Sequence, residues 1–234
     1  MNTLLTTLPT PMLAQTAWDW EFAGLILPVL LQGLWLTVQA TLLAIPIALV
    51  LGLVLALLRR SPRKLVRWPV ATVIEFIRGT PLLIQLFFLF YALPEFGIRF
   101  GAITTGVIGL GLHFATYASE AYRAGIDAVP KGQWEAACSV NLSTFDTWRQ
   151  IVLPQAIPTV IPALGNYAVA MFKDAVLLSA IAIPELVFEA RVLQSRSFRT
   201  LEPFTLAGLL FLAISIPAAV GVRYLERRHA YARD

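Results

Sequence analysis

The stretch Leu25–Leu58, LILPVLLQGLWLTVQATLLAIPIALVLGLVLALL, contains no ionisable side chain. A helix needs about 20 apolar residues to cross the hydrocarbon core of a bilayer, so this stretch is more than long enough to cross. The whole chain has the same character, because 58% of its residues are hydrophobic and only 14% are charged, with a mean hydropathy of +0.72. The sequence therefore predicts an all-α integral membrane protein and excludes an ordinary soluble domain.

The residues on either side of this stretch predict its orientation. A basic cluster follows it at once, made of Arg59, Arg60, Arg63, Lys64 and Arg67. Short loops rich in Lys and Arg stay in the cytoplasm. Aromatic residues between Trp18 and Phe22 precede the stretch and are typical of a bilayer surface. We expect residues 1–24 to form a periplasmic or interfacial segment, and they lack the basic start of a signal peptide.

Four further apolar segments predict more spans. They are 81–93, 103–117, 157–187 and 204–222. Prolines and a Lys-Asp pair within 157–187 predict a broken helix there. Arginines after residue 222 favour a cytoplasmic C-terminus, which gives five spans, a transmembrane domain over 25–224 and a tail over 225–234. Splitting 157–187 into two crossings would give six spans, and charge alone separates the two counts weakly.

A polar segment, 125–154, is too rich in charge to lie in lipid. Pro130 suits a helix start, and Asn141 is the non-glycine residue that best tolerates the left-handed backbone at a helix end. Ser143 and Asp146 have capping-box spacing, and Pro154 should stop or bend the helix that follows. The pattern predicts two short helices around a tight corner, which would form a docking element for a partner; the alternative is a solvated linker.

Glu135-Ala136-Ala137, then Asn141, then Ile151-Val152-Leu153-Pro154 resembles the coupling loop of bacterial binding-protein-dependent ABC permeases. Asn141 departs from that family, which usually has Gly there. The resemblance implies a type I importer permease in the inner membrane, working with two copies of an ATP-binding subunit, a second permease subunit and a periplasmic solute-binding protein. The residues implied to contact the ATPase are Glu135, Ala136, Ala137, Asn141, Ile151, Leu153 and Pro154.

Three other segments resemble the polar amino acid uptake group of that family: Phe76–Gln85, Tyr122–Ile126 and Lys173–Ser179. Within the group, Trp18–Ala23, Gly109–His113 and Leu201–Pro203 resemble permeases of ectoine and hydroxyectoine systems. The resemblance therefore implies ectoine or hydroxyectoine as cargo. Histidine, arginine or glutamine is the alternative cargo, because permeases for these amino acids resemble the chain in most of the same segments.

Few residues suit catalysis or cofactor binding. The single cysteine, Cys138, has no metal-ligand spacing around it, and His113 and His229 are the only histidines. No G-x-x-x-x-G-K-[ST] phosphate loop is present, so ATP must be hydrolysed by a partner subunit. We expect a transporter subunit that is not itself an enzyme and binds no cofactor or metal. The net charge of +4 comes from cytoplasmic arginines and predicts contact with lipid and no nucleic acid.

Polar residues within apolar segments are costly there and are the candidates for the solute pathway. The candidates are Gln85, His113, Asn166, Lys173, Asp174 and Ser179. Consecutive helix residues do not share a face, so at most one of Lys173 and Asp174 should meet solute and the other should pair within the bundle. His113 has an alternative use in an interhelical hydrogen bond. An ion-coupled secondary carrier is the rival class, and it would need no ATPase.

Overall fold

A computed structural model describes residues 18–230, with side chains to residue 227, and every regular element in this range is helical. The expectations for residues 1–17 and 231–234 and for the His229 side chain lie outside the described residues. The helices are α1 (Trp20–Arg59), α2 (Lys64–Arg78), α3 (Leu82–Phe87), α4 (Ala102–Asp127), α5 (Lys131–Ser139), α6 (Thr144–Thr147), α7 (Leu153–Asp174), α8 (Leu186–Ser197) and α9 (Leu201–Ala230). The prediction of an all-α protein is confirmed.

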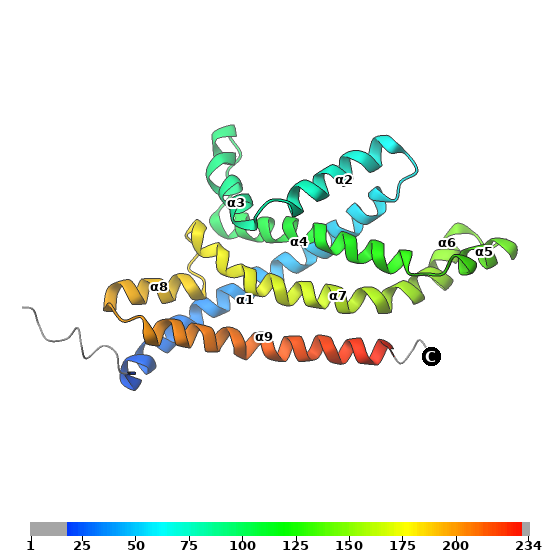
Figure 1. The fold of residues 1–234 in the computed structure, drawn as a ribbon. Coiled ribbons are helices and arrows are strands. Elements are labelled where there is room, and N and C mark those ends of the chain that lie inside the picture. The colour runs from blue at the N-terminus through cyan, green and yellow to red at the C-terminus, as the bar shows by residue number, and fades with distance from the viewer. Residues whose placement is uncertain (1–17, 231–234) are drawn as a thin grey trace, which may run out of the picture.

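The long helices α1, α4, α7 and α9 form a bundle (Figure 1). Helices α5 and α6 extend from one end, and α8 lies at the other, beside the start of α1. Helix α2 runs back from the end of α1 and contacts both α1 and α4 (Figure 1). The main core forms where α1, α3, α4 and the end of α7 meet, with Leu86, Leu110 and Leu178 fully buried.

Helix α1 is one continuous helix of 40 residues, as expected. From residue 33 onward its buried residues are all small and form a stripe: Gly33, Thr37, Ala40, Thr41, Ala44, Ala48, Gly52 and Ala56. Small residues let helix backbones approach closely, which is how helices pack in a medium that gives no hydrophobic drive for their association. At Gly52 an added Cβ would lie 2.7 Å from the Ala118 Cβ and 2.9 Å from the Ala115 carbonyl oxygen, so α1 and α4 touch there.

Three helical stretches in residues 18–227 are long and apolar enough to cross a membrane: 20–59, 144–181 and 201–227. The pair formed by α2 and the helical segment 82–96 adds a fourth candidate, bent by 103°. Helix α4 corresponds to the remaining expected span. It carries glycines, threonines and His113 and lies between α1 and α7, so it needs less apolar surface than a lipid-facing helix.

The second expected span, 81–93, is not a simple straight helix. Helix α3 ends at Phe87 and continues as a π-helical stretch, Phe88–Ala92, and a 3₁₀ stretch, Leu93–Phe96. The chain turns sharply between α2 and α3, where Pro81 precedes the new helix. The amide of Gln85 braces this corner by donating to the carbonyl oxygens of Ile77 at 2.7 Å and Thr80 at 3.0 Å.

Pro154 does not stop the helix, although a stop is one of the two outcomes predicted for it. Helix α6 passes through a π-helical turn, Trp148–Val152, directly into α7, so residues 144–181 form one helical stretch. The amide of Leu153 bonds to the Trp148 carbonyl five residues back, and Pro154 then occupies the first turn of α7, where its missing N–H is tolerated. The second half of the polar segment 125–154 is therefore continuous with the apolar helix α7.

The break expected within 157–187 is found at its far end. Helix α7 tightens into a 3₁₀ stretch, Ala175–Ile181, and Ala182 adopts a left-handed conformation with φ 58°. Helix α8 has 12 residues, too few to cross. Arg199, just after α8, pairs with Asp19 at 2.9 Å, so α8 ends beside the start of α1. This arrangement favours five spans over six.

Substituting Gly52 should weaken the contact between α1 and α4. We expect Gly52→Ala to lower the thermal unfolding midpoint of the purified transporter in detergent, by an amount equivalent to about 1–3 kcal/mol, because the new methyl must displace Ala118 or the backbone. Gly208→Ala in α9 is the matched control, since a Cβ there meets nothing within 4 Å. Equal losses for both variants would contradict the proposed close contact.

Candidate functional site

The α5–α6 projection is held by local hydrogen bonds at its corner. Asn141 has a φ of 52°, as predicted for the left-handed position. The amide of Leu142 bonds to the Ala137 carbonyl at 3.1 Å and that of Asn141 to Cys138 at 3.0 Å, which is a Schellman ending. The Ser143 hydroxyl accepts from the Asp146 amide at 3.1 Å and donates to its carboxylate at 2.5 Å, so Ser143 caps α6 as expected.

The projection also has a small core of its own. Ile126, Val129, Val152 and Ala156 are buried together, and Trp134 packs edge to face against Trp148 with ring centroids 5.6 Å apart. This core joins α5 to the end of α4 and to the start of α7. The projection is therefore a packed extension of two long helices, α4 and α7.

The residues predicted to contact an ATPase fall into two sets. Glu135, Ala136, Asn141, Leu153 and Pro154 are exposed, whereas Ile151 is half-buried and Ala137 is buried inside the projection. Ala137 therefore supports the corner and does not face outward. The sequence analysis missed two apolar side chains on the same projection, Val140 and Phe145, which are 69% and 70% exposed. They could have been predicted from their positions, because both are apolar residues close to the Asn141–Ser143 corner of a polar segment.

Two of the pathway candidates meet inside the bundle. His113 on α4 is buried, and its Nδ1 lies 3.1 Å from the Oε1 of Gln85, which is the interhelical hydrogen bond considered for it. The ring centroids of His113 and Tyr117 are 5.2 Å apart, and those of Tyr117 and Tyr167 on α7 are 5.7 Å apart. The Arg78 guanidinium lies 5.3 Å from the centre of the Tyr117 ring.

The structure thus adds Arg78, Tyr117 and Tyr167 to the cluster around His113. Sequence reasoning missed Arg78 because an arginine at a helix end is also typical of an interfacial anchor. It missed Tyr117 and Tyr167 because no local pattern shows which helix a tyrosine inside a helix will contact. Their distance from His113 depends on how α2, α4 and α7 pack. The cluster combines a cation, phenol groups and an imidazole in one place, which suits a polar solute better than an apolar one.

The other candidates lie away from this cluster. Asn166 is exposed on α7, and the Ser179 hydroxyl is occupied by the Val176 carbonyl at 2.8 Å. Lys173 faces a groove of about 590 Å³ against α9, which Phe211 and Ser215 also line. Asp174 is half-buried. Neither Lys173 nor Asp174 forms a salt bridge with another side chain among residues 18–227, so the expected pairing within the bundle is not found.

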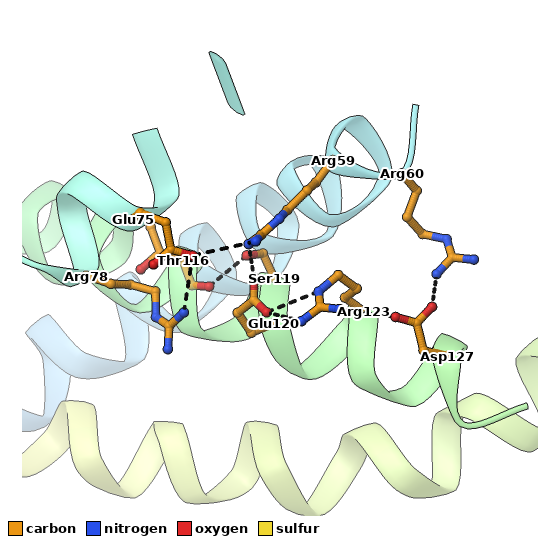
Figure 2. Close-up of polar contacts among 9 residues, drawn as sticks. All are labelled: Arg59, Arg60, Glu75, Arg78, Thr116, Ser119, Glu120, Arg123 and Asp127. Atoms are coloured by element: carbon orange, nitrogen blue, oxygen red, sulfur yellow. Dashed lines mark hydrogen bonds and ion pairs between the residues drawn. The ribbon is translucent and has the colours of Figure 1, made fainter. Parts of the chain in front are cut away.

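A network of charges joins the ends of α1, α2 and α4 (Figure 2). Arg59 pairs with Glu120 and Glu75, Arg60 pairs with Asp127, and Arg123 bonds to Glu120 at 2.6 Å and Asp127 at 3.2 Å. Two residues of the basic cluster that predicted the topology, Arg59 and Arg60, therefore also form salt bridges between helices. At the opposite end, the Phe22 amide and the Arg199 guanidinium hold the pKa of Asp19 below its usual value.

Residues 18–227 form a multi-helix domain with helices able to cross a membrane and a packed helical projection at one end. Residues 48–231 match the family model described as the inner membrane component of binding-protein-dependent transport systems. The chain belongs to this family, so it is a non-catalytic, multi-pass inner membrane permease subunit, and ATP is hydrolysed by a partner ATPase. The family also implies a solute-binding protein as a partner.

Individual relatives extend over nearly the whole chain. A probable amino-acid ABC transporter permease protein of Sinorhizobium fredii is 48% identical over 205 residues, which is 88% of this chain and 89% of the relative. A probable glutamine ABC transporter permease protein of Bacillus subtilis is 34% identical over 198 residues, 85% of this chain and 92% of the relative.

Solved structures agree with the fold. A chain from the crystal structure of an amino acid ABC transporter with histidines superposes with a TM-score of 0.85 at 34% identity, covering 91% of this chain and 99% of that one. A chain of a methionine ABC transporter in inward-facing conformations gives a TM-score of 0.62 at 15% identity, covering 89% and 99%, which supports the fold alone.

The corner of the projection should respond to backbone strain at Asn141. A branched side chain is disfavoured at positive φ, so we expect Asn141→Val to speed amide hydrogen exchange in α5 by an amount equivalent to at least about 1 kcal/mol. Asn141→Gly should keep or increase protection. Gln133→Val, exposed on the same helix, is the control for adding a branched residue. Unchanged exchange in Asn141→Val would contradict this account.

Proposed function

We propose that this chain is the permease subunit of an ABC importer whose cargo is a polar amino acid. The observation that carries the proposal is the similarity over 91% of the chain to a transporter solved with histidines. The relatives described above are named for amino acids or glutamine. These findings favour the amino-acid alternative over ectoine, which the short sequence resemblances alone suggested.

The cluster around Tyr117 supports a zwitterionic cargo. An amino acid carries a carboxylate and an ammonium, so its route needs groups that attract each charge. Arg78, held over the Tyr117 ring, can attract a carboxylate, and His113 and Tyr167 add polar atoms beside it. Asp174, which has no salt bridge within the described side chains, is our candidate for the ammonium. Gln85 is better explained as the brace of the α2–α3 corner, because its amide is already bonded.

The α5–α6 projection supplies a surface suited to an ATPase. Its exposed Glu135 offers a charged contact, and Val140 and Phe145 offer apolar ones that a groove on a partner would remove from water. An ATPase can drive the permease only if it holds the projection differently in the two transport states. We infer that two such ATPases act on two permease subunits, and that residues 125–154 carry the contact.

The arrangement of the bundle supports an N-terminus in the periplasm and a C-terminus in the cytoplasm. The α5–α6 projection, the turn between α1 and α2 and the C-terminal end of α9 all lie toward one end (Figure 1). The basic residues from Arg59 to Arg67, together with Arg223 and Arg227, belong to that end, as the positive-inside rule requires of a cytoplasmic face. The start of α1 and helix α8 lie at the opposite end.

The cargo is tested by uptake in cells that express this chain with its ATPase, its partner permease and its binding protein. We expect labelled histidine, arginine or glutamine to be taken up, and a hundredfold excess of ectoine to leave that uptake unchanged. Uptake of labelled ectoine, blocked by hydroxyectoine, would overturn the amino-acid assignment. Uptake that persists when the ATPase subunit is deleted would instead favour an ion-coupled carrier.

The docking role of Glu135 is tested by charge reversal. We expect Glu135→Arg to reduce ATP-dependent uptake by at least about tenfold, because losing a buried charged contact costs more than 1.4 kcal/mol. Gln133→Arg adds the same group two residues away, on another face of α5, and should retain most uptake. Equal uptake in both variants and the unmodified protein would show that this face of α5 does not contact the ATPase.

A further inference from the structure

Arg59 lies at the centre of the charge network in Figure 2 and contacts two helices at once. Its Nη1 atom faces the Glu120 carboxylate of α4, and its Nη2 atom lies 3.5 Å from Glu75 Oε1 of α2. A guanidinium is a planar fork whose nitrogens can serve separate carboxylates, whereas a lysine ammonium is a compact point charge. The bridge therefore depends on arginine and not on positive charge alone.

The two ends of this bridge differ in how firmly they are held. Glu120 is 18% exposed and belongs to α4, which packs tightly against α1 through Gly52 two turns before Arg59. Glu75 is 60% exposed and belongs to α2. Ile74 is the only buried side chain of α2 in the structure described. Helix α2 is thus attached to the α1–α4 pair through Ile74, through the Arg59–Glu75 contact and through Arg78 over the Tyr117 ring.

Both ends of the network lead to the sites already described. Glu120, Arg123 and Asp127 follow one face of α4 down to its last residue, and Ile126 beside them belongs to the core of the projection. At the other end, Arg78 lies 3.9 Å from Glu75 and stacks over Tyr117. Arg59 therefore stands between the projection and the cluster proposed for the cargo.

We propose that Arg59 is a positioning residue for transport, which bridges Glu75 and Glu120 and so ties helix α2 to the helix that carries the α5–α6 projection. When the ATPase displaces the projection, α4 moves with it, and the bridge makes α2 and Arg78 follow. This inference rests on the docking role proposed for the projection. It does not depend on which amino acid is carried.

The test uses the complete transporter in proteoliposomes, with uptake and ATP hydrolysis measured on the same sample. We expect Arg59→Lys to lower the amount of solute imported per ATP by about 2- to 30-fold, the range seen when residues that link two sites are changed. Arg60→Lys is the matched control, because Arg60 pairs with Asp127 of α4 and forms no salt bridge with a side chain of α2 among residues 18–227. That variant should stay within twofold of the unmodified protein.

Glu75→Gln separates positioning from folding. This exposed side chain can be changed without disturbing the core. The change removes the α2 end of the bridge and the Arg78–Glu75 contact, and it leaves Arg59 and Glu120 paired. We expect the same loss of import per ATP as in Arg59→Lys, with ATP hydrolysis retained. Wild-type import per ATP in both Glu75→Gln and Arg59→Lys would overturn the proposal.

A distance measurement tests the coupled motion directly. Cys138 is the only cysteine, so Cys138→Ser gives a cysteine-free background for spin labels at Trp68 on α2 and Lys131 on α5, both exposed. When Arg59 is present, we expect ATP to change the distance between the labels at Trp68 and Lys131, because α2 moves. We expect Arg59→Lys to broaden the distribution of that distance. An identical ATP response with and without the bridge would overturn the inference. A failed cargo assignment would instead abolish uptake of that solute in every sample and leave these distances unaffected.

Discussion

The close approach of α1 and α4 is the constraint on which the other features depend. Burying side chains gains little between helices that are already in hydrocarbon, so the two helices are held by backbone proximity, and small residues permit it. The stripe from Gly33 to Ala56 on α1 provides that surface, and at Gly52 no side chain fits. Once α1 and α4 are in register, Arg59 necessarily lies beside Glu120, and α4 is placed to carry both His113 and the projection.

The same stripe of small residues on α1 also packs against the irregular backbone that follows Ile181. Irregular backbone at membrane depth is tolerated only where protein satisfies its polar groups. Gly33 lets the backbone at Glu185 and Leu186 approach to about 3.0 Å of where a Cβ would be. The Leu186 amide donates to the Thr37 hydroxyl at 3.2 Å, and that hydroxyl donates to the Gly33 carbonyl at 2.9 Å. One face of α1 therefore serves both a tight helix contact and a chain break.

Local signals in the sequence were enough for the first span and for the projection's corner. Asn141 and Ser143 act on residues within a few positions of themselves, and their roles could be predicted for that reason. The Pro154 stop failed because a π-helical turn absorbed the missing amide, a choice that depends on the surrounding packing. Arg59 and Glu120 are 61 positions apart, so their pairing follows from helix register, which no local pattern encodes.

The charge network around Arg59 contributes more to the relative positions of the helices than to the free energy of unfolding. An exposed ion pair contributes about 0–1 kcal/mol, and several of these carboxylates are partly open to solvent. Arg59 of α1 pairs with Glu75 of α2 and Glu120 of α4, whereas Arg123 pairs with two carboxylates of its own helix. Moving α2 or α4 alone would therefore break one of the two Arg59 contacts. A network of this kind adds little to the free energy of unfolding but resists relative displacement of α2 and α4. Such resistance would let a displacement of α4 reach α2, as the proposed role of Arg59 requires.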